Sequence, residues 1–330
     1  MLKQGIEKLI GQQSLSEPEL EASVLEMIET ENISQVAAFL SLLSAKGETV
    51  SEILTLVKVI QRLMIKIPTT KKTLDIVGTG GDGFNTFNIS SGAALLAAST
   101  GVTVAKHGNR GVSSKVGSAD VLEYLGVAMH AEAELIAKSL SKHQFAFCYA
   151  PNFHQTLYNL KTVRQELKVS TVFNLLGPLL NPTTPQHLMI GVANPKHLQL
   201  LADVLLQLNC NHSMVFHCQG LDELCTLGPV AAIEINHSQQ TKLILDPMDY
   251  SFNYCQLADL QGGNLRSNAQ GLLAALSGIV NPLADTLIFN AGVANYLFGL
   301  SPSIETGVKL ARTHQRQGLA INLLNKLGEK

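Results

Sequence analysis

Apolar residues recur at helical spacing through the first 67 residues of the chain. Ser16 and Glu19 form a capping box, a side-chain pattern that begins helices, and an apolar stripe over residues 20–28 follows it. A second helix is expected over residues 34–46. A third begins at the capping box of Thr49 and Glu52 and ends at Pro68. The sequence therefore predicts a helical unit over residues 1–67.

From Leu74 onward the pattern changes to short apolar strands separated by helices. Strands are expected over residues 74–77, 102–105, 145–150, 189–192, 213–218 and 231–235. Helices are expected over residues 92–99, 119–125, 133–141 and 197–208. This alternation predicts an α/β domain with a mostly parallel central sheet, in which ligands bind beyond the carboxyl ends of the strands.

Residues 155–181 break the alternation with a helical pattern followed by the stretch TVFNLLGPLLNP. We expect this segment to return to the N-terminal helices and to leave a cleft at the crossing. The predicted division is a helical domain over residues 1–67, with a return segment near 155–182, and an α/β domain over residues 68–154 and 183–330.

Composition and charge exclude several classes of protein. The 330 residues suffice for about two domains, and 46% hydrophobic against 15% charged residues argues against disorder. The net charge of -2 provides no overall field to attract nucleic acid or an anionic membrane. An anionic ligand must therefore be bound by a local site.

Five cysteines without a C-x-x-C spacing argue against a disulfide framework and favour a reducing cytoplasm. The first 21 residues mix acids and bases and lack the apolar run of a signal peptide. The uncharged stretch over residues 83–105 is too polar to span a bilayer. We expect a cytoplasmic protein without a membrane segment.

The first candidate site is GTGGDGFNTFNISS, residues 78–91, between a predicted strand and a predicted helix. Its glycines allow backbone N–H groups to face a ligand, and the helix N-terminus adds partial positive charge, so a phosphate fits there. The loop is not a P-loop, because no Lys-Ser or Lys-Thr follows the glycines. A tight strand-to-helix turn is the alternative.

The second candidate is KHGNRGVSSKVGSADVLE, residues 106–123, directly after the predicted strand 102–105. Lys106, Arg110 and Lys115 lie among glycines and serines, and together they offer charge, N–H and hydroxyl donors to a polyanion. A solvated basic loop is the alternative.

The third candidate is the acid pair Asp222 and Glu223, just past the strand predicted over 213–218. Carboxylates beside phosphate-binding loops are typical of a Mg2+ site, because Mg2+ is held by one or two carboxylates together with substrate phosphates. An acidic surface turn is the alternative.

Taken in order, these segments resemble the anthranilate phosphoribosyltransferase family. The segments that carry the resemblance span the chain: QVAAFLSLLSAKGET, GTGGDGFNTFNIS, KHGNRGVSSKVGSADVLE, FNLLGPLLNP and GLDEL. The resemblance implies a small helical domain, a large α/β domain, a homodimer formed through the helical domain, and two Mg2+ ions per active site. It also implies transfer of phosphoribosyl from phosphoribosyl pyrophosphate to anthranilate, a step of tryptophan synthesis from chorismate.

The resemblance further implies roles for particular residues. Phosphoribosyl pyrophosphate is expected to contact Gly81, Asp82, Thr86, Asn88, Ile89, Ser90, Ser91, Lys106, His107, Gly108, Asn109, Arg110, Gly111, Val112, Ser113, Ser114 and Ser118. Anthranilate is expected to contact Gly78, Asn109, Arg164, His154 and Pro178, and Mg2+ to bind Ser90, Asp222 and Glu223.

In this chemistry pyrophosphate leaves C1 of the ribose, and the amine of anthranilate attacks that carbon. Lys106 and His107 are the expected catalytic residues. Lys106 and backbone dipoles stabilise the leaving group, whereas His107 positions the amine, because an aryl amine needs no strong base.

The chain departs from the family pattern in one region. Gln155-Thr156-Leu157 and Lys168-Val169-Ser170 replace the usual residues in the segment expected to shape the acceptor site, and Ser91 replaces a common Thr. A related transferase with another aromatic acceptor is therefore one alternative. A pyrimidine nucleoside phosphorylase is a second, disfavoured by Lys106 to Arg110 and by the acid pair. A non-catalytic nucleic-acid-binding relative is the third, disfavoured by the net charge.

Overall fold

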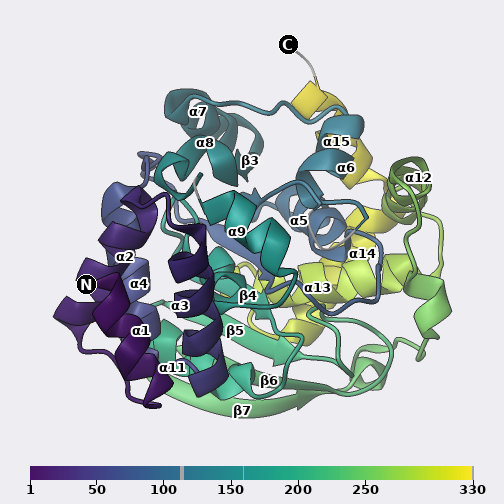
Figure 1. The fold of residues 1–330 in the computed structure, drawn as a ribbon. Coiled ribbons are helices and arrows are strands. Elements are labelled where there is room, and N and C mark those ends of the chain that lie inside the picture. Colours follow the sequence, from purple (N-terminus) through teal and green to yellow (C-terminus); the bar gives the residue numbers. More distant parts are fainter. Residues whose placement is uncertain (112–114, 159, 329–330) are drawn as a thin grey trace.

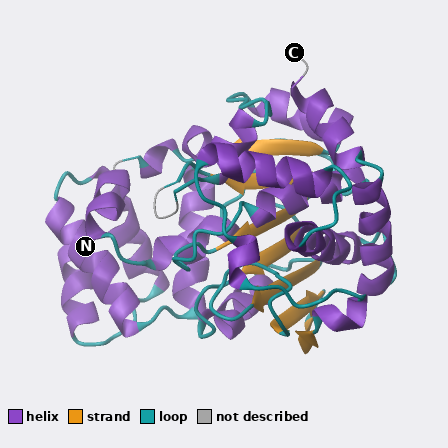
Figure 2. Cartoon of the chain, turned by 90° about the vertical axis from the view of Figure 1, so that its right-hand side faces the viewer, coloured by secondary structure: helices purple, strands orange, loops and turns teal. Residues whose placement is uncertain are grey.

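A bundle of helices and a larger body built on one sheet lie side by side in the computed structural model (Figures 1 and 2), which describes residues 1–111, 115–158 and 160–328. The bundle contains α1 (Leu2–Ile10), α2 (Glu17–Glu29), α3 (Ile33–Lys46) and α4 (Val50–Leu63). The sequence pattern predicted α2 to α4 closely. It did not single out α1, which packs against α2 and α3.

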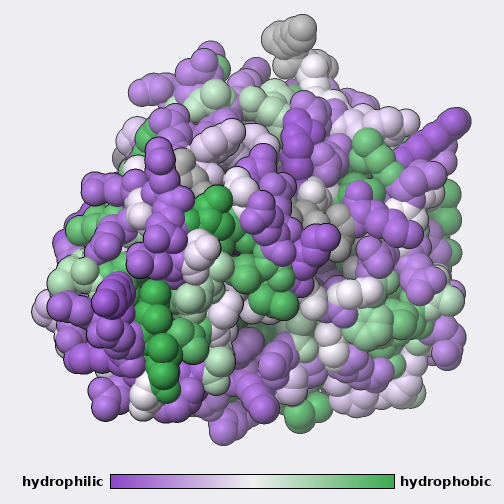
Figure 3. Space-filling view, in the orientation of Figure 1, coloured by the Kyte–Doolittle hydropathy of each residue, from purple (hydrophilic) through white to green (hydrophobic). Residues whose placement is uncertain are grey.

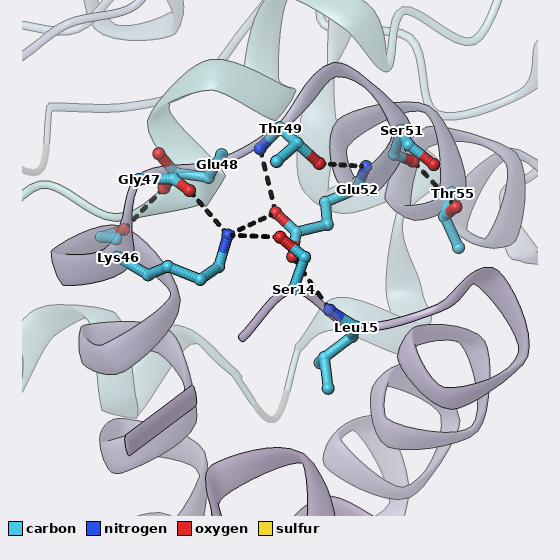
Figure 4. Close-up of polar contacts among 10 residues, drawn as sticks. Ser14, Leu15, Lys46, Gly47, Glu48, Thr49, Ser51, Glu52 and Thr55 are labelled. Atoms are coloured by element: carbon cyan, nitrogen blue, oxygen red, sulfur yellow. Dashed lines mark hydrogen bonds and ion pairs between the residues drawn. The ribbon is translucent and has the colours of Figure 1, made fainter. Parts of the chain in front are cut away.

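Glu52 joins three segments of this bundle (Figure 4). Its carboxylate accepts hydrogen bonds from the backbone N–H of Thr49 at 2.9 Å and of Leu15 at 3.2 Å. It also forms an ion pair with Lys46 Nζ at 2.9 Å. The capping residue predicted for α4 therefore also ties the end of α3 and the chain entering α2 to the same point.

The body contains a seven-stranded sheet in the order β3-β2-β1-β4-β5-β6-β7. The strands are β1 (Leu74–Gly78), β2 (Val104–Gly108), β3 (Phe145–Tyr149), β4 (His187–Gly191), β5 (His212–His217), β6 (Val230–Asn236) and β7 (Gln239–Leu245). The first five are parallel, whereas β6 and β7 run antiparallel to their neighbours. The predicted fold class, a helical domain with a mostly parallel α/β domain, is confirmed. The edge strand β7 was not predicted.

Helices cover both faces of the sheet. The remaining α-helices of the body are α5 (Ile89–Ser99), α6 (Ser118–Tyr124), α7 (Ala133–His143), α8 (Ala150–Phe153), α11 (His197–Gln207), α12 (Leu265–Leu276), α13 (Pro282–Phe298), α14 (Ile304–Arg316) and α15 (Leu319–Gly328). Short 3-10 turns are η1 (Gln155–Leu157), η2 (Gly177–Leu179), η3 (Pro247–Tyr250) and η4 (Leu257–Leu260).

Alternate residues of the strands face the helices on opposite sides of the sheet. Ile76 and Met189 belong to the apolar cluster that contains α5 and α13, whereas Leu188 and Ile190 belong to the cluster that contains α11 and α4. Among the described residues, no helix is long and apolar enough to cross a membrane.

The segment after β3 runs back to the helical bundle. It contains α9 (Leu160–Leu167) and α10 (Val172–Leu176), which contact α3 and α4. Leu160, Val163 and Phe173 belong to the same apolar cluster as the bundle residues Phe39 and Leu56. The wall opposite the glycine loop is therefore built by this segment.

The prediction for β2 needs a correction. The sequence pattern placed a strand over residues 102–105 with the basic segment after it, whereas β2 spans Val104–Gly108 and pairs with β3 along its whole length. Lys106 and His107 thus lie inside a strand, where only 2% and 5% of their surfaces are exposed. The hydropathy pattern missed this extension because these polar side chains find buried partners.

Candidate active site

A cleft of about 900 Å³ opens at the carboxyl ends of the central strands, between the sheet and the return segment. Its lining comes from the glycine loop, from β2 and the loop after it, from the acid pair, and from α9 to α10. Among its residues are Gly78, Gly81, Asp82, Thr86, Asn88, Ser90, Lys106, His107, Gly108, Asn109, Arg110, Gly111, Ser118, Arg164, Lys168, Val169, Ser170, Asn174, Asp222 and Glu223. Segments distant in the sequence thus meet around one cavity.

The glycine loop lies directly on the acid pair. The backbone N–H of Gly80 donates a hydrogen bond to Asp222 Oδ2 at 2.6 Å, and Gly80 has the left-handed φ of 71°. A Cβ at Gly78 would lie 2.1 Å from Asp222 Oδ2. Only glycine at position 78 therefore lets the Asp222 carboxylate approach the end of β1.

Negative charge is concentrated at this end of the cleft. Burial, and after it the charge of Asp82, raises the pKa of Asp222 to about 7. Removal from water, and after it the charge of Asp222, raises the pKa of Glu223 well above its ordinary value. These carboxylates therefore have less compensating charge from the protein than their ionised forms require.

Lys106 is the buried cation of the cleft. Its Nζ donates hydrogen bonds to the backbone oxygen of Ile76 at 2.8 Å and to Ser90 Oγ at 3.2 Å. Burial lowers its pKa, and the charges of Asp75 and Glu223 oppose that shift. A bound polyanion would stabilise the charged ammonium in this position.

His107 is held as a neutral imidazole. Burial, and after it the neighbouring His154, lowers the pKa of His107 to about 3. Its Nδ1 lies 3.2 Å from the backbone oxygen of Gly177, which can only accept, so Nδ1 carries the proton. Nε2 has no hydrogen-bond partner among the described residues and is left as an acceptor.

The loop after β2 is organised around Asp120. Its carboxylate accepts hydrogen bonds from the backbone N–H groups of Gly111 and Gly117, each at 2.9 Å, and pairs with Arg110 at 3.0 Å. Arg110 also pairs with Glu123 at 2.8 Å, and these carboxylates raise its pKa. In this structure Arg110 is therefore engaged by protein carboxylates rather than free for a ligand.

The return segment contributes a cation and an amide to the opposite wall. Arg164 lies 5.3 Å from the ring centroid of Phe173, and burial, with no carboxylate of the described chain opposing it, lowers its pKa. Asn174 donates to the backbone oxygen of Thr79 at 3.4 Å, which joins this wall to the glycine loop. The unusual stretch Lys168 to Ser170 lines the cleft, whereas Gln155 to Leu157 does not.

Some residues named from the sequence lie outside the cleft lining. Ile89 and Ser91 are buried in the first turn of α5, and Pro178 is buried in η2. His154 is also buried, with its Nε2 at 2.8 Å from the backbone oxygen of Leu180 and its ring edge-on to His107. Val112, Ser113 and Ser114 lie outside the described residues.

Sequence reasoning missed three polar residues: Asn174, which lines the cleft, and Asp75 and Asn181, which bond to the backbone of β2. Asn174 lies within the FNLLGP motif, from which only Pro178 was selected. Asp75 and Asn181 are buried, and the N–H of His107 donates to Asp75 Oδ1 at 3.2 Å. A polar residue inside a predicted apolar strand was the available signal for Asp75, and the asparagine before the proline of the LLNP stretch was the signal for Asn181.

The oxygen donors of the cleft fit a hard divalent cation. After burial, the charge of Asp82 raises the pKa of Asp222, and the charges of Asp222 and Asp82 raise that of Glu223; a bound cation would relieve this repulsion. No cluster of three or more ligating His, Cys, Asp or Glu side chains occurs in the part of the chain that the structure describes. Mg2+ takes few protein ligands and completes its shell with water and substrate oxygens.

Comparisons with known proteins give one consistent result. The helical bundle domain of the glycosyl transferase family matches residues 3–64, and the a/b domain of that family matches residues 70–321. An anthranilate phosphoribosyltransferase of Chlamydia felis is 40% identical over 327 residues, which cover 99% of this chain and 95% of that protein.

Solved structures agree. The anthranilate phosphoribosyltransferase of Thermus thermophilus superposes with a TM-score of 0.91 at 36% identity, covering 98% of both chains. That of Saccharomyces cerevisiae in complex with PRPP and Mg has a TM-score of 0.89 at 25% identity, covering 99% of this chain and 96% of the yeast chain. A further structure of the yeast protein holds 4-fluoroanthranilate, with a TM-score of 0.88 and the same identity and coverage.

Proposed function

The chain belongs to the anthranilate phosphoribosyltransferase family, and from that premise we propose how its cleft transfers phosphoribosyl from phosphoribosyl pyrophosphate to anthranilate. The observation that carries the proposal is the meeting of the glycine loop, Lys106 and the acid pair Asp222 and Glu223 at one end of the sheet. A pyrophosphate needs N–H donors, a cation and a metal site together, and here all three lie around one cavity.

We assign donor binding to the glycine loop, to β2 and to the loop after it. The backbone around Gly81 and the side chains of Thr86 and Asn88 face the pyrophosphate and ribose, and Asn109 and Ser118 close the other side. Ile89 and Ser91 do not contact the donor directly. They are buried in the first turn of α5 and support the backbone that places Ser90 in the cleft.

Mg2+ would be held by Asp222, Glu223 and Ser90, with Asp82 beside them; we propose two ions per site. When bound, Mg2+ supplies positive charge that neutralises pyrophosphate oxygens and the carboxylates around them. The remaining steps depend on side chains of the protein.

The bond between C1 of the ribose and the pyrophosphate oxygen breaks as the bond between C1 and the anthranilate nitrogen forms. Lys106 Nζ, held by Ile76 and Ser90, lies where the leaving pyrophosphate gains negative charge. His107 Nε2 accepts a hydrogen bond from the anthranilate amine and orients it toward C1. With a pKa of about 3, His107 is a weak base, so the amine loses its proton to water or phosphate oxygen after attack.

Arg164 and Asn109 bind the acceptor. The Arg164 guanidinium lines the cleft without a carboxylate partner in the described chain, so the carboxylate of anthranilate fits it as a counter-ion. His154 and Pro178 support this wall from behind rather than touching the acceptor. Because Lys168 to Ser170 line the same wall, a different aromatic acceptor is the second candidate function, and this departure favours it.

We further propose a homodimer formed through the helical domain and a cytoplasmic location. Figure 3 shows hydrophobic side chains at the surface on the side of the N-terminal helices, and Ile10, Leu25 and Ile33 are exposed there. All five cysteines are free thiols, which supports a reducing compartment.

The test is the fluorescence of anthranilate in the presence of the protein, Mg2+ and phosphoribosyl pyrophosphate. We expect the signal to fall, and to persist when Mg2+ is omitted or when Asp222→Asn/Glu223→Gln replaces the wild-type protein. Metal-independent phosphorolysis of a pyrimidine nucleoside would favour a phosphorylase instead. Binding of phosphoribosyl pyrophosphate without consumption of anthranilate would point to another acceptor.

A further inference from the structure

Strands β1 and β2 are joined at their amino ends and separate toward the cleft. The backbone N–H of Leu74 donates to the oxygen of Thr103 at 2.9 Å, and Leu74 with Val104 is the one bridged pair recorded between these fully described strands. In contrast, β1 pairs with β4, and β2 with β3, along their whole lengths. An unbroken parallel ladder in this register would continue with Ile76 N–H to the oxygen of Ala105 and His107 N–H to the oxygen of Ile76.

Side chains form hydrogen bonds with the backbone groups that these two missing rungs would have paired. Asn181 Nδ2 donates to the oxygen of Ala105 at 2.7 Å, and Lys106 Nζ donates to the oxygen of Ile76 at 2.8 Å. The N–H of His107 donates to Asp75 Oδ1 at 3.2 Å. Three of the four hydrogen-bonding groups of the two rungs, the oxygens of Ala105 and Ile76 and the N–H of His107, therefore have a side-chain partner.

The groups that replace the rungs form a small buried network. Asn181 Nδ2 also donates to Asp75 Oδ2 at 2.9 Å, and Asn181 Oδ1 accepts from the N–H and the hydroxyl of Thr183. Asp75 is fully buried and Asn181 is 1% exposed. Burying a carboxylate and an amide is unfavourable unless their polar atoms form hydrogen bonds, and here those atoms bond to each other and to the backbone of β2.

We propose that Asp75 and Asn181 are positioning residues that hold β1 and β2 apart, so that Lys106 can reach the cleft. If the ladder closed, the N–H of His107 would occupy the oxygen of Ile76, and Lys106 would lose the anchor that holds its Nζ beside Ser90. The gap between the strands thus directs the ammonium toward the leaving pyrophosphate. This role in catalysis rests on the proposed function, whereas the separation of the strands does not.

Asn181→Leu tests the proposal, because leucine is close to asparagine in size but cannot donate to Ala105 or Asp75. The matched control is Asn295→Leu, a buried asparagine of α13 whose Nδ2 donates to the oxygen of Gly307 at 3.1 Å, away from the cleft. We expect both variants to lower the thermal unfolding midpoint. Only Asn181→Leu should lower kcat for anthranilate consumption, by about 10- to 100-fold, with little change in the KM for anthranilate.

A crystal structure of Asn181→Leu supplies a readout that does not depend on activity. We expect the N–H of His107 to bond to the oxygen of Ile76 and Lys106 Nζ to leave Ser90. Equal kinetics for Asn181→Leu and Asn295→Leu, or an unchanged separation of the strands, would overturn the proposal. If Asn181→Leu does not fold, Asp75→Asn takes its place, since it keeps an acceptor for His107 but presents an amide to the Asn181 amide.

Failure of the proposed function gives a different result. A wild-type protein that does not consume anthranilate would remove the proposed function and with it the catalytic role of the separation. The strand separation itself would still be decided by the crystal structure.

Discussion

Glu52 and Asp222 are both buried carboxylates, but they differ in how far the surrounding protein compensates their negative charge. Glu52 is 1% exposed and receives two backbone N–H groups and the ammonium of Lys46. Asp222 is 7% exposed and receives the N–H of Gly80, but Asp82 and Glu223 lie beside it. The charge of Glu52 is compensated by the protein, whereas negative charge is in excess around Asp222.

The difference separates structural charge from functional charge. A compensated pair holds segments together and gains nothing from a ligand. A cluster of carboxylates without compensating charge destabilises the unliganded protein. Its ionised form is favoured only when a cation, or a ligand complex that carries a cation, binds. The cleft carboxylates are therefore expected to lower stability while enabling binding, and Glu52 is expected to do neither.

The largest expected effect on stability comes from Glu52→Ala, which leaves Lys46 buried without its partner. The free energy of unfolding should fall by about 3 kcal/mol, because removing one member of a buried pair strands the other charge. Urea denaturation measures it, and kcat of the folded fraction should not change.

The control for Glu52→Ala is Glu17→Ala, which removes an exposed ion pair with Lys58. It should change stability by less than about 1 kcal/mol. Equal losses in the two variants would show that the network of Glu52 does not hold the bundle together.

The next effect concerns the close approach at Gly78. Gly78→Ala places a Cβ against the Asp222 carboxylate and displaces the acid pair. We expect kcat/KM to fall by about 10- to 100-fold, since small displacements of a positioned group have effects of that size. Anthranilate fluorescence measures the rate, and an unchanged rate would mean that the position of Asp222 is not critical.

A smaller effect is expected in the dependence of stability on pH. The pKa of His107 is lowered to about 3 and that of His187 to about 4, mainly by burial. The unfolded chain therefore binds protons more readily than the folded chain as pH falls from about 6.5 toward 4, and stability is lost in that range. The raised pKa of Asp222 acts in the opposite sense, because protonation there favours the folded state.

Urea denaturation at pH 7 and pH 5 separates these contributions. His107→Asn should reduce the acid-side loss of stability by about 2 kcal/mol. Asp222→Asn/Glu223→Gln should increase that loss, because it removes carboxylates that are stabilised by protonation. If stability depended on pH identically in the wild-type protein and in both variants, neither His107 nor the acid pair would account for the pH dependence.

The parts of the fold that follow local patterns were predictable from sequence. Capping boxes located α2 and α4, and alternating apolar segments located the parallel strands. The C-terminal end of β2 was not predictable from sequence. Lys106 and His107 are polar, and they are buried only because residues distant in sequence bond to them.

The same limit applies to the candidate site. The glycine loop and the acid pair stand out as motifs, and the structure brings them together. Asp75 lies in no motif and Asn181 lies in the FNLLGPLLNP motif without a role assigned to it, because the role of both depends on a strand separation that exists only in three dimensions. Arg110 stands out as a cation, yet its pairing with Asp120 and Glu123 could not be read from composition.

Thermal unfolding of the wild-type protein and of Asp222→Asn/Glu223→Gln, each with and without Mg2+, tests the account most directly. Without Mg2+ the variant should unfold at the higher temperature, because the excess of negative charge is gone. Mg2+ should raise the midpoint of the wild-type protein and leave the variant unchanged. A variant less stable than the wild-type protein, or one that Mg2+ stabilises equally, would contradict the account.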